Sequence, residues 1–323
     1  MSWLGKRRRS SDPPASTAED SDAPVGWDNG RTMSLYRRLV ERSYRHPALI
    51  VCLEGWIDAG IGASGAASAI LGSRATEVIV RWDADELIDH RARRPVLHIV
   101  DGVATSLNWP EIELRAAVDD TGRDLLMLVG PEPDMRWHGF CASVVTLAQE
   151  FDVRMVIGLG AFPAPVPHTR PMRLVATAPT PQLAAEVGFI GGSIDVPAGV
   201  QAALEHEFNR AGIPAVGLWA RVPHYVVSMP YPAASAALVD GAAAVGGLTL
   251  TSRDLHDSAA RARSRIDELI ANSDEHKAMV AQLESQVDRE TAEGAGEFDP
   301  ATLPSGDEIA AELERFLRGD GAL

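Results

Sequence analysis

The chain has 323 residues, of which 46% are hydrophobic and 23% are charged, and its formal net charge is −15 at pH 7. Enough apolar residues are present to form a sizeable core, which excludes a largely disordered chain. The acidic excess argues against a general nucleic-acid-binding protein, because neutralising phosphates requires clustered Lys and Arg.

The apolar and basic runs and the two cysteines indicate the cellular compartment in which we expect the protein. No apolar run reaches about 18 residues, and the basic run at 6–9 is followed by Ser, Asp and Pro, so we expect neither a membrane span nor a secretory signal. The basic run itself is typical of a solvated terminus. Cys52 and Cys141 lack CxxC spacing and are typical of small buried residues. We therefore expect a soluble, cytoplasmic protein.

The first part of the chain alternates between apolar runs and helical stretches. Residues 1–32 are rich in Ser, Asp, Pro, Ala and Gly, which predicts a disordered N-terminus. The runs predicted as strands are 49–53, 78–82, 97–100, 125–129, 153–158, 174–177 and 215–220. The predicted helices are 62–71, 137–151, 199–210 and 233–245. Continuously apolar strands separated by helices indicate one α/β core over 33–248, a mainly parallel sheet with helices on both faces.

The C-terminal part has a different composition and helical spacing. Residues 249–290 predict an appendage of two amphipathic helices, and 291–304 predict a linker. A capping box then begins a short amphipathic helix over 305–318. Its apolar stripe consists of Ile309, Leu313, Phe316 and Leu317. This stripe either binds a partner protein or folds back on its own domain.

Loops at the predicted strand ends carry unusual residue combinations. The five blocks are EGWIDAG at 54–60, DADELID with the arginines that follow at 83–95, GPEPD with Trp137 at 130–137, VPHTRP at 166–171 and VPHY at 222–225. In this order they resemble the proteasome assembly chaperone family, over the core and the first C-terminal helices. The resemblance implies a core similar to nucleoside phosphorylases, frequent oligomerisation, and a family whose eukaryotic members chaperone proteasome subunits. It implies no catalytic residue.

Polar residues of these loops are the candidates for a ligand pocket, because ligands of parallel sheets bind beyond the carboxyl ends of the strands. The candidates are Glu54, Asp58, Asp83, Asp85, Glu132, Asp134, His168, Arg170 and His224. One interpretation places His168, Arg170 and Arg94 around an anion, with a carboxylate such as Glu54 or Asp85 as base. The alternative, which we favour, is that these groups form ion pairs and hydrogen bonds that hold the loops. We also predict that the 166–171 loop borders the main pocket.

No complete catalytic, phosphate-binding or metal-binding motif is present in the sequence. Asp83, Asp85 and Asp134 are too few ligands for a hard cation, so we expect no metal and no cofactor. We predict a non-catalytic, homo-oligomeric assembly protein that binds a proteasome-related partner and neither nucleic acid nor membrane. The alternative is a small-molecule hydrolase or transferase, which gains support if Glu54, Asp85, His168 and Arg170 converge on one cavity.

Overall fold

The structure is a computed structural model that describes residues 34–179, 181, 184 and 193–292. Three predictions lie outside the described residues: the disordered segment 1–32, most of the linker 291–304, and the helix 305–318 with its apolar stripe. The fold, the site and every contact below concern the described residues.

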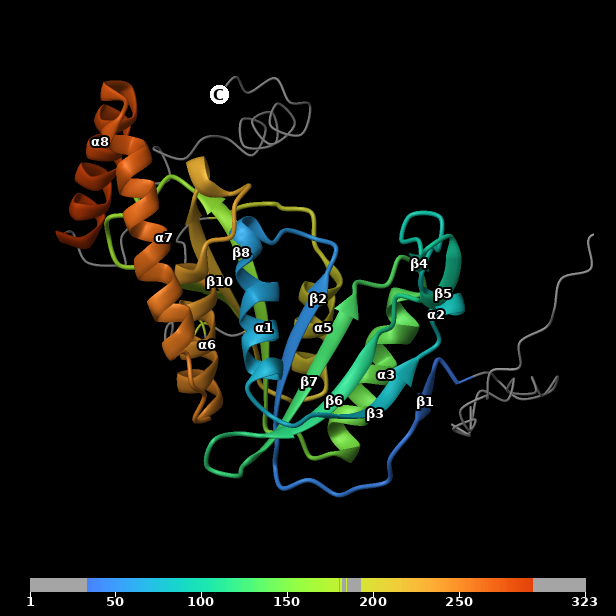
Figure 1. The fold of residues 1–323 in the computed structure, drawn as a ribbon. Coiled ribbons are helices and arrows are strands. Elements are labelled where there is room, and N and C mark those ends of the chain that lie inside the picture. Colours follow the sequence, from blue (N-terminus) through green and yellow to red (C-terminus); the bar gives the residue numbers. More distant parts are fainter. Residues whose placement is uncertain (1–33, 180, 182–183, 185–192, 293–323) are drawn as a thin grey trace, which may run out of the picture. The chain divides into compact units, whose positions relative to one another are not determined.

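A mixed sheet forms the centre of the described chain, with eight strands in the order β1-β3-β6-β7-β2-β8-β10-β9 (Figure 1). Their bounds are β1 Tyr36–Arg38, β2 Ala48–Glu54, β3 Glu77–Trp82, β6 Glu113–Val118, β7 Asp124–Pro131, β8 Met155–Ala164, β9 Leu174–Thr177 and β10 Ala215–Pro223. The central strands β7, β2, β8 and β10 are parallel, as predicted. The outer strands are antiparallel to their neighbours.

The antiparallel pairing of β6 with β7 follows from a short connection. β6 joins β7 through the turn at 119–123, which is too short for the crossover that a parallel pair requires. The sequence analysis missed β6 because Glu113 and Arg115 interrupt its apolar residues. The prediction of a mainly parallel sheet therefore holds for the centre of the sheet and not for its edges.

Helices cover both faces of the sheet, as the sequence predicts. Along β2, Ala48, Ile50 and Cys52 face one hydrophobic cluster, whereas Leu49 and Val51 face another. This alternation is the period of a strand that is buried on both sides. The first cluster is covered by α1 (Gly62–Gly72) and α6 (Pro232–Gly246), and the second by α3 (Trp137–Glu150) and α5 (Val200–Arg210).

Two long helices follow the sheet, as predicted for 249–290. α7 (Arg253–Ala271) packs along α6, and α8 (Asp274–Ala292) packs against α7 (Figure 1). Their buried apolar residues are few: Ala262 and Ile266 on α7, and Val280, Leu283 and Val287 on α8. Among the residues that the structure describes, no helix has both the length and the apolar character that a membrane crossing needs.

A small hairpin lies apart from the main sheet. β4 (Val96–Val100) pairs only with β5 (Val103–Asn108) in the described chain, and every residue of both strands is exposed. The predicted strand at 97–100 therefore exists, but its assignment to the core is wrong. The reason is the turn: Asp101 and Gly102 both have positive φ angles, the conformation that closes a two-residue hairpin, so β4 pairs with its chain neighbour.

Candidate functional site

Every candidate residue lies at one edge of the main sheet. β3 is antiparallel to β6 and β6 is antiparallel to β7, so β3 points the same way as the parallel central strands. The carboxyl ends of β3, β7, β2, β8 and β10 therefore meet at one edge, which we call the carboxyl edge. The candidate side chains follow these strand ends, but their contacts separate them into groups.

The first group stabilises the loop after β3. Asp83 accepts a hydrogen bond from the Asp85 N–H at 3.0 Å and begins the short helix α2 (Ala84–Leu87). Asp85 in turn lies 3.0 Å from His90 Nε2. Asp134, after β7, accepts a hydrogen bond from Arg93 Nε at 3.3 Å. These carboxylates are therefore committed to local loop structure.

The second group surrounds a hollow at the end of β2. Asp58 accepts hydrogen bonds from Ala63 N at 2.7 Å, Ser64 N at 3.0 Å and the Ser64 hydroxyl. It thus binds the N-terminus of α1, where the free N–H groups and the helix dipole favour a negative charge. Glu54 lies at the mouth of the hollow, exposed, and its carboxylate has no hydrogen-bond partner among the described residues.

The hollow has a volume of about 270 Å³. Its lining residues are Cys52, Leu53, Glu54, Gly55, Trp56, Ile57, Asp58, Ile61, Ala63, Ser64 and Leu159. Burial, with a smaller contribution from the charges of Asp58 and Glu54, raises the pKa of the Cys52 thiol to about 12. Cys52 is therefore neutral at physiological pH and is a poor nucleophile.

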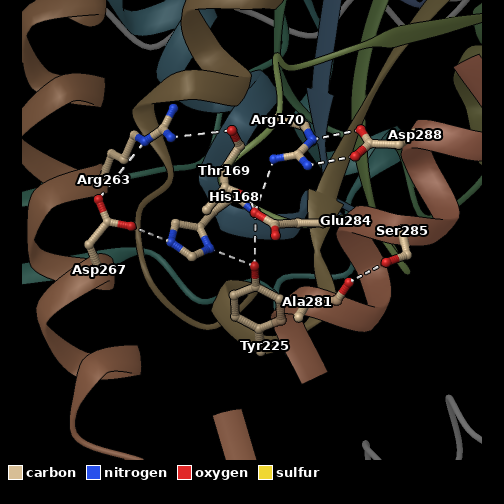
Figure 2. A network of polar contacts seen from close by, with 10 residues as sticks. All are labelled: His168, Thr169, Arg170, Tyr225, Arg263, Asp267, Ala281, Glu284, Ser285 and Asp288. Atoms are coloured by element: carbon tan, nitrogen blue, oxygen red, sulfur yellow. Dashed lines mark hydrogen bonds and ion pairs between the residues drawn. The ribbon is translucent and has the colours of Figure 1, made fainter. Parts of the chain in front are cut away.

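The third group joins the 166–171 loop to the C-terminal helices (Figure 2). His168 is buried, with Nε2 at 2.9 Å from Asp267 Oδ1 of α7 and Nδ1 at 2.7 Å from the Tyr225 hydroxyl. Because a carboxylate only accepts, Nε2 carries the hydrogen in a neutral imidazole and Nδ1 accepts from Tyr225. The His168 N–H donates to the same hydroxyl oxygen at 2.8 Å. Both ring nitrogens of this buried imidazole are therefore engaged by other side chains of the described chain.

Arg170 completes this connection through α8. Its Nε and one terminal nitrogen donate to the two oxygens of Asp288 at 2.8 and 2.7 Å, and the other terminal nitrogen donates to Glu284 at 3.0 Å (Figure 2). The hydrogen bonds from Arg170 lower the pKa of Asp288. Thr169 also donates to Glu284, and Arg263 of α7 donates to the Thr169 carbonyl at 3.2 Å. We call this set of contacts the loop–helix network.

The remaining candidates are also structural. Glu132 is buried, and its carboxylate accepts a hydrogen bond from the N–H of Val200, the first residue of α5. His224 begins the 3-10 helix η2 (His224–Val226), is exposed, and places its ring edge-on to Tyr225 at 5.3 Å. Neither residue faces the hollow at the end of β2.

The groups named for an acid–base pocket do not converge. Glu54 lies at the hollow, Asp85 contacts His90, and His168 and Arg170 contact α7 and α8. The geometry is that of the favoured alternative, in which ion pairs hold the loops. The 166–171 loop does border a cavity, but one of only about 20 Å³, enough for a single water. The loop therefore lies at the carboxyl edge and borders a cavity, as predicted, but that cavity is smaller than the hollow at the end of β2.

The partners of His168 and Arg170 were missed by the sequence analysis. Asp267, Glu284 and Asp288 look like ordinary charged residues on the exposed faces of amphipathic helices. A signal does exist in the spacing of Glu284 and Asp288, which are four residues apart and therefore share one face of α8. Nothing in the spacing says that this face meets the 166–171 loop.

Comparison with known proteins places this architecture in a family. The model of the PAC2 family matches residues 52–270, more than half of the chain. The chain belongs to the PAC2 family. The matched residues include the loops after β2, β3, β7, β8 and β10, together with α7. Glu284 and Asp288 lie beyond them.

Solved structures of similar proteins support the assignment. A Mycobacterium tuberculosis protein of unknown function, Rv2714, is 34% identical with a TM-score of 0.73, covering 82% of this chain and 94% of its own. A Corynebacterium glutamicum protein of unknown function is 32% identical with a TM-score of 0.77, covering 81% and 100%. The Mycobacterium tuberculosis proteasome-assembly chaperone homologue Rv2125 is 32% identical with a TM-score of 0.67, covering 73% and 99%. No curated protein matches the chain.

Proposed function

We propose that this PAC2-family chain is a non-catalytic protein that assists the assembly of a proteasome-related protein partner and works as a cytoplasmic homo-oligomer. The observation that carries the proposal is the commitment of His168 and Arg170, the groups best suited to hold a substrate anion, to α7 and α8. The likeness to a protein named as a proteasome-assembly chaperone homologue supports the class of partner.

The β4–β5 hairpin supports self-association. Leu97 and Leu107 are directly paired and therefore share one face, and both are about half exposed, at 50% and 46%. Val96, Ile99 and Val103 are exposed still further. An isolated two-stranded hairpin is marginally stable in water, and an apolar surface of this kind is typical of an interface. We propose that another copy of the chain covers this hairpin.

Affinity purification tests the assembly role. The full chain, carrying a tag at its N-terminus, is captured from its own host, and bound proteins are quantified by mass spectrometry against an untagged strain. We expect core-particle subunits or their precursors to be enriched. A variant with Arg170→Glu, which breaks the loop–helix network, serves as the comparison. Repeated absence of proteasome subunits from the wild-type capture would contradict the proposal.

The segment 305–318 remains a proposed partner-binding element, since it lies outside the described residues. Replacing Leu313 and Phe316 by Asp should remove captured partners while thermal unfolding stays unchanged. If the stripe packs on its own core instead, the same variant lowers the unfolding temperature. The matched control is Glu312→Gln, a polar change in the same segment. No change in either measurement would show that the stripe has neither role.

The rival function, a small-molecule hydrolase or transferase, now depends on the hollow at the end of β2. Among the described residues that line it, Glu54 is the carboxylate without a side-chain hydrogen bond, because Asp58 is held by Ala63 and Ser64. One free carboxylate without an opposed acid or nucleophile is an incomplete acid–base site. We therefore rank the assembly role first.

A further inference from the structure

The hollow at the end of β2 combines apolar walls with carboxylates. Leu53, Ile57, Ala63 and Leu159 contribute apolar surface, and Glu54 and Asp58 contribute the charged groups. Its volume of about 270 Å³ lies just below the ~300–1,000 Å³ of typical small-molecule sites. The hollow therefore suits a single long side chain or a small molecule with an apolar stem.

The lining is negatively charged at neutral pH. Among the described residues that line the hollow, the ionisable groups are Glu54, Asp58 and the thiol of Cys52, which stays neutral because burial raises its pKa to about 12. Arg93 does not line the hollow, but it lies close to Gly55: its Nε donates to Asp134 at 3.3 Å and a terminal nitrogen donates to the Glu54 carbonyl at 3.4 Å. A positively charged group would therefore gain two attractive interactions on entering, whereas a negative group would meet two repulsive ones.

The helix terminus at the hollow does not reverse this preference. The N-terminus of α1 would ordinarily attract an anion, but its Ala63 and Ser64 N–H groups already donate to Asp58 at 2.7 and 3.0 Å. An anionic ligand would have to displace this carboxylate. The same hydrogen bonds hold Asp58 in a defined position, so a cation would meet a preorganised partner.

An aromatic side chain lies beside the carboxylates. Trp56 lines the hollow and remains 47% exposed. Its indole packs against Gly199, where a Cβ atom would lie only 3.1 Å from Trp56 Cγ, so a larger residue would push the ring away. Tryptophan is the side chain that attracts cations most strongly through its ring face. The ring therefore adds a second, independent preference for a positive charge.

We propose that this hollow binds an alkylammonium group, with Glu54 as the ion-pair partner, Trp56 as the cation–π wall and Asp58 as a fixed second carboxylate. The apolar walls would contact the methylene stem. The group could come from a lysine side chain of a protein or from a free aliphatic amine. The site does not depend on the proposed assembly role, because either source would bind whether or not the chain assists assembly.

Calorimetric titration of the full chain tests the site. The probes are N-acetyl-lysine N-methylamide and N-acetyl-norleucine N-methylamide, an uncharged analogue of the same stem. We expect the lysine probe to bind and the norleucine probe to give no measurable heat. Glu54→Gln should weaken the lysine probe about tenfold, since it removes one charge-assisted contact. Trp56→Leu should weaken it about threefold.

The controls separate this site from general charge effects. Glu77, the first residue of β3, lies at the opposite edge of the sheet, and Glu77→Gln should leave binding unchanged. Asp58 is left intact because it binds the α1 terminus. Unfolding temperatures check that the Glu54 and Trp56 variants are folded. Equal heats for the two probes, no binding of the lysine probe, or affinity unaffected by Glu54→Gln would each overturn the proposal.

A third probe, n-butylamine, distinguishes the two sources. Affinity equal to that of the lysine probe would show that the ammonium and its stem suffice, and would favour a free amine. Much weaker affinity would show that the peptide groups contribute, and would favour a partner lysine. Both outcomes require the Glu54 dependence described above.

Discussion

Glu205 is a buried carboxyl group whose ionisation opposes folding. It lies on α5 with only 9% of its surface exposed, and Thr177 donates to its Oε2 at 3.0 Å. Its Oε1 has no hydrogen bond of ordinary geometry within the described chain and lies against Gly217 of β10, where a Cβ atom would collide with it. Burial raises the pKa of Glu205 from 4.5 to about 7, although the hydrogen bond from Thr177 opposes the shift.

The shift predicts how stability depends on pH. Between pH 4.5 and about 7 the folded chain keeps a proton on Glu205 that the unfolded chain has lost, so the unfolding free energy falls as pH rises. Above pH 7 the loss is complete and constant. The difference between these two pKa values corresponds to about 3 kcal/mol of unfolding free energy. Glu205→Gln removes the ionisable group and keeps an oxygen for Thr177. The variant should therefore match wild type near pH 4.5 and exceed it by about 1–3 kcal/mol at pH 8.

Urea denaturation of both proteins from pH 4.5 to 8.5 measures this difference. Glu207→Gln is the matched control, because Glu207 lies on the same helix, is partly exposed and pairs with Arg210 at 3.0 Å. Its unfolding free energy should change by less than about 0.5 kcal/mol with no trend in pH. The burial argument would be refuted if the difference in unfolding free energy between Glu205→Gln and wild type did not change with pH. It would also be refuted if the variant were less stable than wild type at pH 8.

Other contacts yield further predictions. Burial opposes ionisation of Asp119, but hydrogen bonds such as that from Thr249 N at 2.8 Å outweigh it and lower its pKa to about 2. Asp119→Asn should cost about 1–3 kcal/mol at pH 7 in urea denaturation, and wild type should lose this advantage as pH falls from about 3.8 toward 2. Arg170→Ala should speed hydrogen exchange in α8 but not in α1, and unchanged α8 rates would contradict a holding role for the loop–helix network. Leu97→Glu should reduce the mass measured by sedimentation without lowering the unfolding temperature, and an unchanged mass would mean that the hairpin is not the self-association surface.

Local sequence determined most of the helices and the central strands of this chain. The predicted helix at 199–210 is observed at Val200–Arg210, and that at 233–245 at Pro232–Gly246. The apolar run at 49–53 forms β2. A strand that is buried on both faces of a sheet has apolar side chains at every position, which is the pattern of this run. The position of the candidate residues also follows from sequence. The central strands β2, β8 and β10 are parallel, so their carboxyl ends, and the loops with Glu54, His168 and His224, share one edge.

Tertiary structure decided what those residues do. His168 meets Asp267 and Arg170 meets Asp288 across about a hundred residues of chain, and helical periodicity shows only that α7 and α8 have polar faces. The apolar run in β4 resembles a core strand, yet pairing with β5 leaves it outside the sheet. Glu205 has the sequence context of a solvated helix residue, and only the packing of α5 over Gly217 buries it. In each case the burial or the pairing of a residue depends on two elements that come into contact in the folded chain. A local sequence pattern describes only one of these elements, so it does not predict the contact.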